Sequence, residues 1–147
     1  MILSKACQHA IRALVYIQQQ ASEGESTIGI KAIASGTNSP APITAKILKD
    51  LVKHGLINSK KGPGGGFSIS TETGGTNVID VVLLLEGKDA MKKCPFGIPH
   101  CSDDNPCPAH NEYKVIRAQM TELFEKLTIE ELSKNTEANK GLFGFNS

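Results

Sequence analysis

Three cysteines and a histidine lie close together in the second half of the chain. Cys94, Cys101 and Cys107 fall in a segment rich in Pro, Gly and Asp, and His110 follows three residues after the last cysteine. Thiolates and imidazole are ligands for zinc and for iron–sulfur centres. Structural zinc sites usually pair cysteines two to four residues apart, whereas six and then five residues separate these cysteines. The spacing favours a chain wrapped around a larger inorganic core, and a structural zinc site is the alternative.

The fourth cysteine, the length of the apolar runs and the first residues indicate in which cellular compartment the protein is expected. Cys7 lies on the apolar stripe of a predicted helix, where a cysteine usually acts as a small buried residue. No apolar run is long enough to cross a bilayer, and the first residues lack a signal-peptide pattern. We therefore expect a cytoplasmic protein with reduced thiols and no membrane partner.

A second group of residues fits binding to a polyanion. Residues 1–70 carry a net charge of +5 and residues 71–147 a net charge of −4, which together give the +1 of the whole chain. The basic half is therefore the candidate for contact with nucleic acid. Trp is absent and aromatic residues make up 5% of the chain, so stacking platforms for single strands are not expected.

The elements that position these lysines follow from apolar spacing. We predict a helix over 4–20, a short helix from Ile30 that Gly36 closes, and a third helix over 43–52 that Gly55 stops. Strands at 56–59 and 67–70 flank a loop, 60–66, that is rich in lysine and glycine. This order of parts is that of a winged helix-turn-helix, in which one helix enters the major groove and a basic hairpin contacts the backbone.

The start of the third helix and the loop supply the candidate DNA contacts. Lone surface lysines usually only keep a protein soluble, but their order along these elements favours DNA binding. We expect base contacts from Thr44, Ala45 and Lys46, phosphate contacts from Ser39, Lys49, Lys60 and Lys61, and close backbone approach at Gly64. No Ser-His-Asp arrangement or acid–base pair is evident, so neither an enzyme nor a small-molecule substrate is expected.

The second half of the chain is predicted to be helical around the cysteine segment. A helix over 78–85 ends at Gly87, a loop follows, and a long helix begins near Cys107. Apolar residues on the long helix step by four, three and four, a spacing typical of a helix that packs along a partner: Ile116, Met120, Leu123 and Leu127. Thr128 and Glu131 form a capping-box pattern for a last short helix.

With these parts in place, the chain resembles the Rrf2 family of bacterial winged-helix transcription regulators. The resemblance covers nearly the whole chain, and it rests on the following segments: Leu3-Ser4-Lys5 with Ala10, Lys46-Ile47-Leu48 through Gly55-Leu56, Lys61-Gly62-Pro63-Gly64-Gly65-Gly66-Phe67, and the three loop cysteines before a long helix. It implies a mainly α fold with a small β wing, in which a winged helix-turn-helix is joined to a long dimerisation helix. It further implies a homodimer on a roughly palindromic double-stranded DNA operator, with an iron–sulfur cluster held by the three cysteines.

The resemblance also bears on the fourth cluster ligand. IscR-like members use a histidine three residues after the last cysteine, which matches His110 and implies a 2Fe–2S cluster. NsrR-like members use an aspartate from the partner's first helix, with a 4Fe–4S cluster; this chain has Gln8 there, between Cys7 and His9. The resemblance thus favours 2Fe–2S over 4Fe–4S and leaves Cys7 or His9 of the partner as an alternative. The first two cysteines are one residue further apart than is usual in the family.

These observations predict four segments. Residues 1–87 form the winged helix-turn-helix domain, 88–108 the cluster-binding loop, 109–135 the dimerisation helix with a short terminal helix, and 136–147 a flexible tail.

The predicted function is a transcription regulator whose operator affinity follows cluster state, through iron–sulfur status, redox or nitric oxide. Cluster change would order or release the loop between the long helix and the DNA-binding part. A zinc-stabilised regulator is one alternative. A small redox or cluster-carrier protein is the other, and it leaves the lysine helix and the wing without a role.

Overall fold

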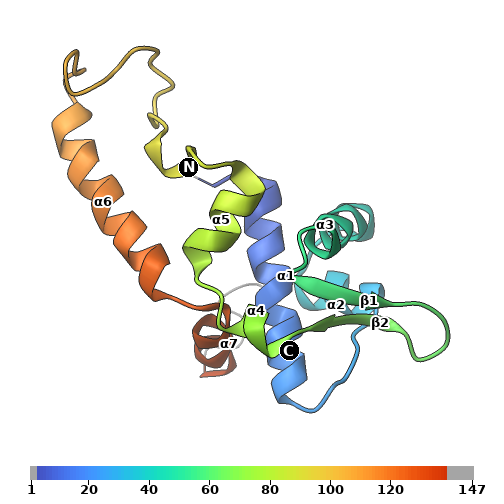
Figure 1. Ribbon diagram of the computed structural model, residues 1–147. Helices are drawn as coiled ribbons and strands as arrows, with labels where there is room; N and C mark the ends of the chain where they lie inside the picture. The colour runs from blue at the N-terminus through green and yellow to red at the C-terminus, as the bar shows by residue number, and fades with distance from the viewer. Residues whose placement is uncertain (1–2, 139–147) are drawn as a thin grey trace.

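The structure is a computed structural model that describes residues 3–138 (Figure 1). Its centre is helix α1 (Lys5–Ser22), which contacts most of the other helices and the β hairpin. These elements together form the body of the molecule. The Ser4 hydroxyl accepts a hydrogen bond from the Cys7 amide at 3.1 Å and so caps the first turn of α1. Leu14 and Ile17 are fully buried in the core. The predicted first helix is therefore confirmed, two residues longer at its end.

The helix-turn-helix consists of α2 (Ile30–Gly36) and α3 (Ala41–Lys53). Asn38, in the turn between them, has a φ of +51°, a left-handed conformation that Asn tolerates better than most residues. The Thr37 hydroxyl donates to the Ile33 carbonyl at 2.7 Å, and the Arg12 guanidinium of α1 donates to the Thr37 carbonyl. The turn is thus fastened to the central helix.

The wing is a two-stranded antiparallel hairpin of β1 (Ile57–Lys60) and β2 (Gly66–Ile69). Ile28 pairs with Phe67 through two backbone hydrogen bonds of 2.8 Å and so adds a single-residue third strand. The one-turn helix α4 (Thr71–Gly74), capped by Ser70, follows β2 and was not predicted from the sequence. Four residues are too few for an apolar period to show.

The second half contains α5 (Val78–Glu86), the short 3₁₀ helix η1 (Ala90–Lys92), α6 (His110–Lys126) and α7 (Ile129–Ala138). α5 packs in the core beside α1, and α7 returns to lie against α1. The capping box is confirmed: the Thr128 amide donates to the Glu131 carboxylate at 2.9 Å, and the Glu131 amide donates to the Thr128 hydroxyl at 3.1 Å. α7 continues three residues into the segment predicted to be tail, and 139–147 lie outside the described residues.

Helix α6 stands at the side of the body and contacts it through α5 and η1 (Figure 1). None of its residues is fully buried. The four apolar residues predicted to pack along a partner do not share one environment. Met120 and Leu127 pack towards the core, while Ile116 and Leu123 are each 51% exposed. Within residues 3–138 no helix combines the length and apolar character that a membrane span requires.

Candidate metal centre and nucleic-acid interface

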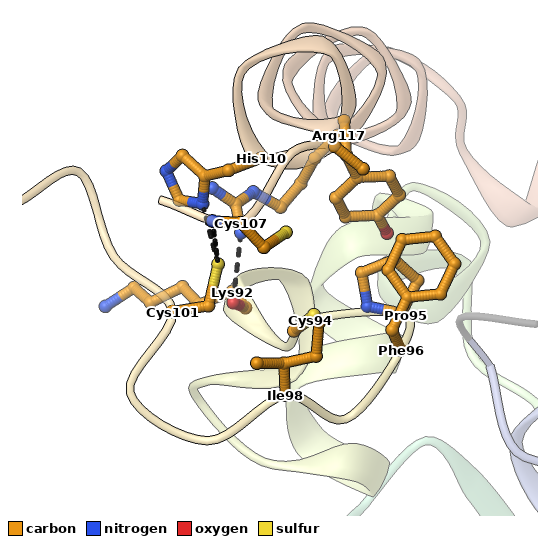
Figure 2. A pocket seen from close by; sticks show the side chains of 11 residues that line it. Lys92, Cys94, Pro95, Phe96, Ile98, Cys101, Cys107, His110 and Arg117 are labelled. Carbon is orange, nitrogen blue, oxygen red and sulfur yellow. Dashed lines mark hydrogen bonds between the residues drawn. The ribbon is translucent and has the colours of Figure 1, made fainter. Parts of the chain in front are cut away.

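The three loop cysteines and His110 line one hollow of about 120 Å³ between the 88–109 loop and the start of α6. Figure 2 shows their side chains turned towards this common space. The cysteine thiols are half-exposed, whereas the His110 side chain is only 12% exposed. The structure thus brings together the four residues that the sequence singled out as metal ligands.

A hydrogen-bond network orders one side of the hollow. Nδ1 of His110 lies 3.2 Å from the Cys101 sulfur, and the Cys107 amide donates to the same sulfur at 3.4 Å. On the other edge of the ring, Nε2 lies 3.0 Å from a carboxylate oxygen of Asp103. Both nitrogens of the imidazole therefore have polar partners. Sequence spacing does not predict this contact, because Asp103 lies seven positions before His110 and the chain changes direction between them.

Backbone amides, and to a smaller extent one cation, favour the thiolate form of Cys94. The backbone amides of Ile98 and Phe96 hold the pKa of the Cys94 thiol below its ordinary value, and the Arg117 guanidinium acts in the same direction. Gly97 has a φ of +65°, a conformation that suits glycine and that directs this turn towards the sulfur. Arg117, a residue of α6 that sequence reasoning missed, also donates to the Lys92 carbonyl at 3.0 Å.

Cys101 has the opposite tendency. The Cys107 amide on its own would lower the pKa of the Cys101 thiol, but burial and the neighbouring sulfurs of Cys107 and Cys94 together raise it. Three thiolates in one hollow repel each other, and a cation bound among them offsets that repulsion. The donor set therefore fits a thiolate-bound metal group. In the part of the chain that the structure describes, no group of three or more His, Cys, Asp or Glu residues is placed so that it could hold a single metal ion.

The predicted start of the long helix needs correction. The long helix begins at His110 rather than near Cys107, so Cys107 lies in the turn before the helix, where its carbonyl accepts from the His110 amide at 3.0 Å. Pro106 and Pro108 keep the segment before them out of the helix.

The alternative ligands on the first helix are engaged within their own subunit. Cys7 is 1% exposed, and burial, then the Glu86 carboxylate, raises its pKa to about 12. His9 bonds through Nδ1 to the Ser39 hydroxyl at 2.9 Å. The interior position of Cys7 removes it as a ligand for a partner's cluster.

The candidate DNA contacts on α3 divide into exposed and buried residues. Ala45, Lys46 and Lys49 are exposed, as a groove-facing surface requires. Thr44 is wrong as a base contact: it is 2% exposed, and its hydroxyl donates to the Pro40 carbonyl at 2.9 Å. Ile43, 44% exposed on the same turn, has the exposed position instead.

Ser39 lies at the entrance to α3 and is half-buried. Its hydroxyl is bonded to His9 of α1, so it links the helix-turn-helix to the central helix. Ser39 therefore has a positioning role in the structure, and its phosphate contact stays a prediction.

The wing is held in a defined shape beside α3. Lys60, the last residue of β1, and Lys61, the first residue of the loop that follows, are exposed. The Thr27 hydroxyl donates to the Gly64 carbonyl at 3.0 Å. A Cβ on Gly65 would come within 2.2 Å of the Lys60 carbonyl oxygen. The glycines thus allow a tight loop, rather than the flexible connection that a glycine run alone would predict.

The two candidate sites lie far apart. In Figure 1 the 88–109 loop is at the end of the molecule where α6 begins, and the wing projects from the opposite side of the body. The cysteine loop lies between the long helix and the DNA-binding part in sequence, but it is remote from the wing in space. Any coupling between the two sites must therefore pass through the helices.

A helix-turn-helix, a basic glycine wing and an appended long helix define a winged-helix DNA-binding transcription regulator. A family model described as "Rrf2: Iron-dependent Transcriptional regulator" matches residues 3–135, and the chain belongs to this family. The predicted family and fold class are thereby confirmed.

Individual relatives agree with this assignment. The chain is 32% identical over 135 residues to a protein of Aquifex aeolicus named "Putative HTH-type transcriptional regulator", covering 90% of this chain and 91% of the relative. It is 23% identical to the HTH-type transcriptional regulator IscR of Xenorhabdus nematophila, over 93% of this chain and 82% of that protein. The fold and the relatives are those of regulators rather than enzymes.

Two solved structures share the fold. CymR, the global cysteine regulator of B. subtilis, has a TM-score of 0.71 at 21% identity, covering 91% of this chain and 97% of that chain. T. potens IscR has a TM-score of 0.70 at 20% identity, covering 94% and 90%. At these identities the likeness establishes the fold alone.

Proposed function

We propose that this regulator binds its operator with an affinity set by an iron–sulfur cluster held by Cys94, Cys101, Cys107 and His110. The observation that supports the proposal is the convergence of three thiols and one imidazole on a single hollow. The resemblance to IscR-like members, whose fourth ligand matches His110, favours 2Fe–2S over 4Fe–4S. When bound, such a group supplies a centre that exchanges an electron and is sensitive to its chemical surroundings.

The residues around the hollow suit an anionic group. Lys92 and Arg117 line it, and backbone amides are directed at the Cys94 sulfur. Hydrogen bonds to ligand sulfurs are one of the means by which proteins tune iron–sulfur centres. The description of the matching family, "Iron-dependent Transcriptional regulator", supports an iron-based cofactor for this chain.

We propose a cytoplasmic homodimer as the DNA-binding form. The outer face of α6 leaves Val115, Ile116 and Leu123 between 51% and 59% exposed. Apolar residues grouped along one helix face are typical of a face covered by a partner. A two-fold dimer would present two α3 helices and two wings to a palindromic duplex, with phosphate contacts from Lys49, Lys60 and Lys61.

Helices provide a route from the hollow to α3. Arg117 ties α6 to the Lys92 carbonyl in η1, and η1 packs against α5. Glu86, the last residue of α5, accepts a hydrogen bond from the Ser4 amide at 2.9 Å at the start of α1. α1 in turn holds the helix-turn-helix through Arg12. A change in the loop can reach α3 along this path if the cluster binds two conformers unequally.

The test compares cluster-loaded and cluster-free protein on the same DNA. Duplexes are first enriched from a random pool by each form under anaerobic conditions, and affinities are then measured at one fixed salt concentration. We expect at least one enriched duplex to distinguish the two forms by tenfold or more. Equal affinities on every enriched duplex would reject the switch, and a colourless protein that holds zinc would replace it with the structural-zinc alternative.

A further inference from the structure

We propose that Asp103 is a positioning residue for the cluster: by holding Nε2 of His110, it makes Nδ1 the nitrogen that binds iron. This inference rests on the proposed function. It assigns a role to a residue of the loop that is not itself a ligand.

The geometry of the ring carries the proposal. Nε2 of His110 is 3.0 Å from Asp103 Oδ1, and Nδ1 is 3.2 Å from the Cys101 sulfur in the hollow (Figure 2). If the imidazole ring were rotated by 180° about its Cβ–Cγ bond, carbon atoms instead of nitrogens would face Asp103 and Cys101. With its side chain only 12% exposed, the ring is enclosed, and one orientation satisfies both of its edges.

The chemistry of the carboxylate selects the tautomer. An ionised carboxylate only accepts hydrogen bonds, so the imidazole proton must be on Nε2. The lone pair is then on Nδ1, the nitrogen beside the Cys101 sulfur. A carboxylate on the outer nitrogen of a ligating histidine fixes its orientation and makes it a stronger donor.

Asp103 is itself held in place. The Lys114 ammonium donates to the same Oδ1 at 2.7 Å, from one turn further along α6. The 101–105 segment closes on itself through the Ser102 and Asn105 amides, which donate to each other's carbonyls at 3.3 and 3.2 Å. Asp103, His110 and Lys114 therefore link this turn to α6.

The direct test uses histidine labelled with ¹⁵N at one ring position. Full-length protein is loaded anaerobically, its cluster is reduced, and pulsed EPR measures the nitrogen coupling. We expect a strong coupling from the Nδ1 label and a weak, remote coupling from the Nε2 label. A strong coupling from the Nε2 label would overturn the assignment.

A second test asks whether Asp103 exerts this control. Asp103→Ala, Asp103→Glu and Asp103→Asn are compared with the matched variant Asp104→Asn, which changes the adjacent exposed carboxylate. We expect Asp103→Ala to lose its cluster to an iron chelator about tenfold faster, in line with the usual effect of removing a ligand's outer partner. Asp103→Glu should lose its cluster more slowly than Asp103→Ala, because it keeps a carboxylate. Asp103→Asn should raise the reduction potential of the cluster because the negative charge is gone.

The outcomes separate the two proposals. If Asp103→Ala and Asp104→Asn both keep the wild-type retention rate and potential, the role of Asp103 is refuted while the cluster stands. If wild-type protein itself takes up no iron and sulfide, the proposed function fails first. Thermal unfolding of the cluster-free variants checks folding, and we expect no shift from this exposed loop position.

Discussion

The wing lysines allow a quantitative prediction about DNA binding. Lys61 is exposed at the start of the loop that joins the two strands of the wing, and none of the ion pairs within residues 3–138 involves it. Its ammonium group is therefore available for a phosphate. We expect Lys61→Gln to weaken binding to all sequences, because a phosphate contact carries no sequence information.

The size of the effect follows from counterion release. Each phosphate contact contributes about 0.9 to the slope of log affinity against log salt, so losing one contact in each half of a dimer reduces the slope by about 1.8. A fourfold rise in salt should then narrow the affinity gap between wild type and variant by about twelvefold.

Fluorescence anisotropy with an operator duplex over a salt series measures both slopes. The matched control is Lys126→Gln, which removes the same charge from α6, where Lys126 pairs with Glu122. The control should keep the wild-type slope. An unchanged slope for Lys61→Gln would remove Lys61 from the interface and refute the assignment of the wing.

Three further predictions concern the reading helix, the wing and pH. Ile43→Ala should lower the preference for operator over random DNA in a competition assay, because an exposed apolar side chain at the start of α3 can contact a thymine methyl; an unchanged preference would place Ile43 outside the groove. Gly65→Ala should weaken operator binding and lower the melting temperature, since its Cβ would meet the Lys60 carbonyl at 2.2 Å, and wild-type values for both would contradict the tight wing. Burial, then the Arg12 and Lys5 cations, lowers the pKa of His9, so its contribution to stability is complete above the unfolded value of about 6.5 and falls as pH drops below it. Urea unfolding should give a lower free energy of unfolding at pH 5.5 than at pH 7.5, and His9→Gln should reduce this difference. An equal difference in the variant would refute His9 as its source.

Local sequence signals were sufficient for most of the elements. Ser4, the Thr128–Glu131 capping box and Gly87 act through hydrogen bonds and backbone angles within a few residues of each other. Such signals do not depend on the rest of the fold. The glycine wing was identifiable for the same reason.

Positions that depend on packing were less predictable. On α3 the buried stripe is Thr44, Ile47, Leu48 and Leu51, while Ile43 lies outside it. Ile43 and Thr44 both have helical neighbours four residues on, so spacing alone cannot decide which one faces the core. The docking of α3 on α1 decides it.

The cysteine loop shows the same limit more strongly. The sequence identified the donor types and their grouping, because cysteine and histidine have few other reasons to gather in a polar loop. It did not identify Asp103 and Arg117 as their neighbours. Those contacts arise from the path of an irregular loop against α6, which no periodic pattern records.

Metal analysis of protein purified without oxygen tests the central claim most directly. If Cys94, Cys101, Cys107 and His110 hold a 2Fe–2S cluster, the sample is coloured and contains iron and acid-labile sulfide in equal amounts, about two of each per chain. Substitution of Cys101 by serine should remove most of both. A colourless wild-type sample without iron or sulfide would contradict the account.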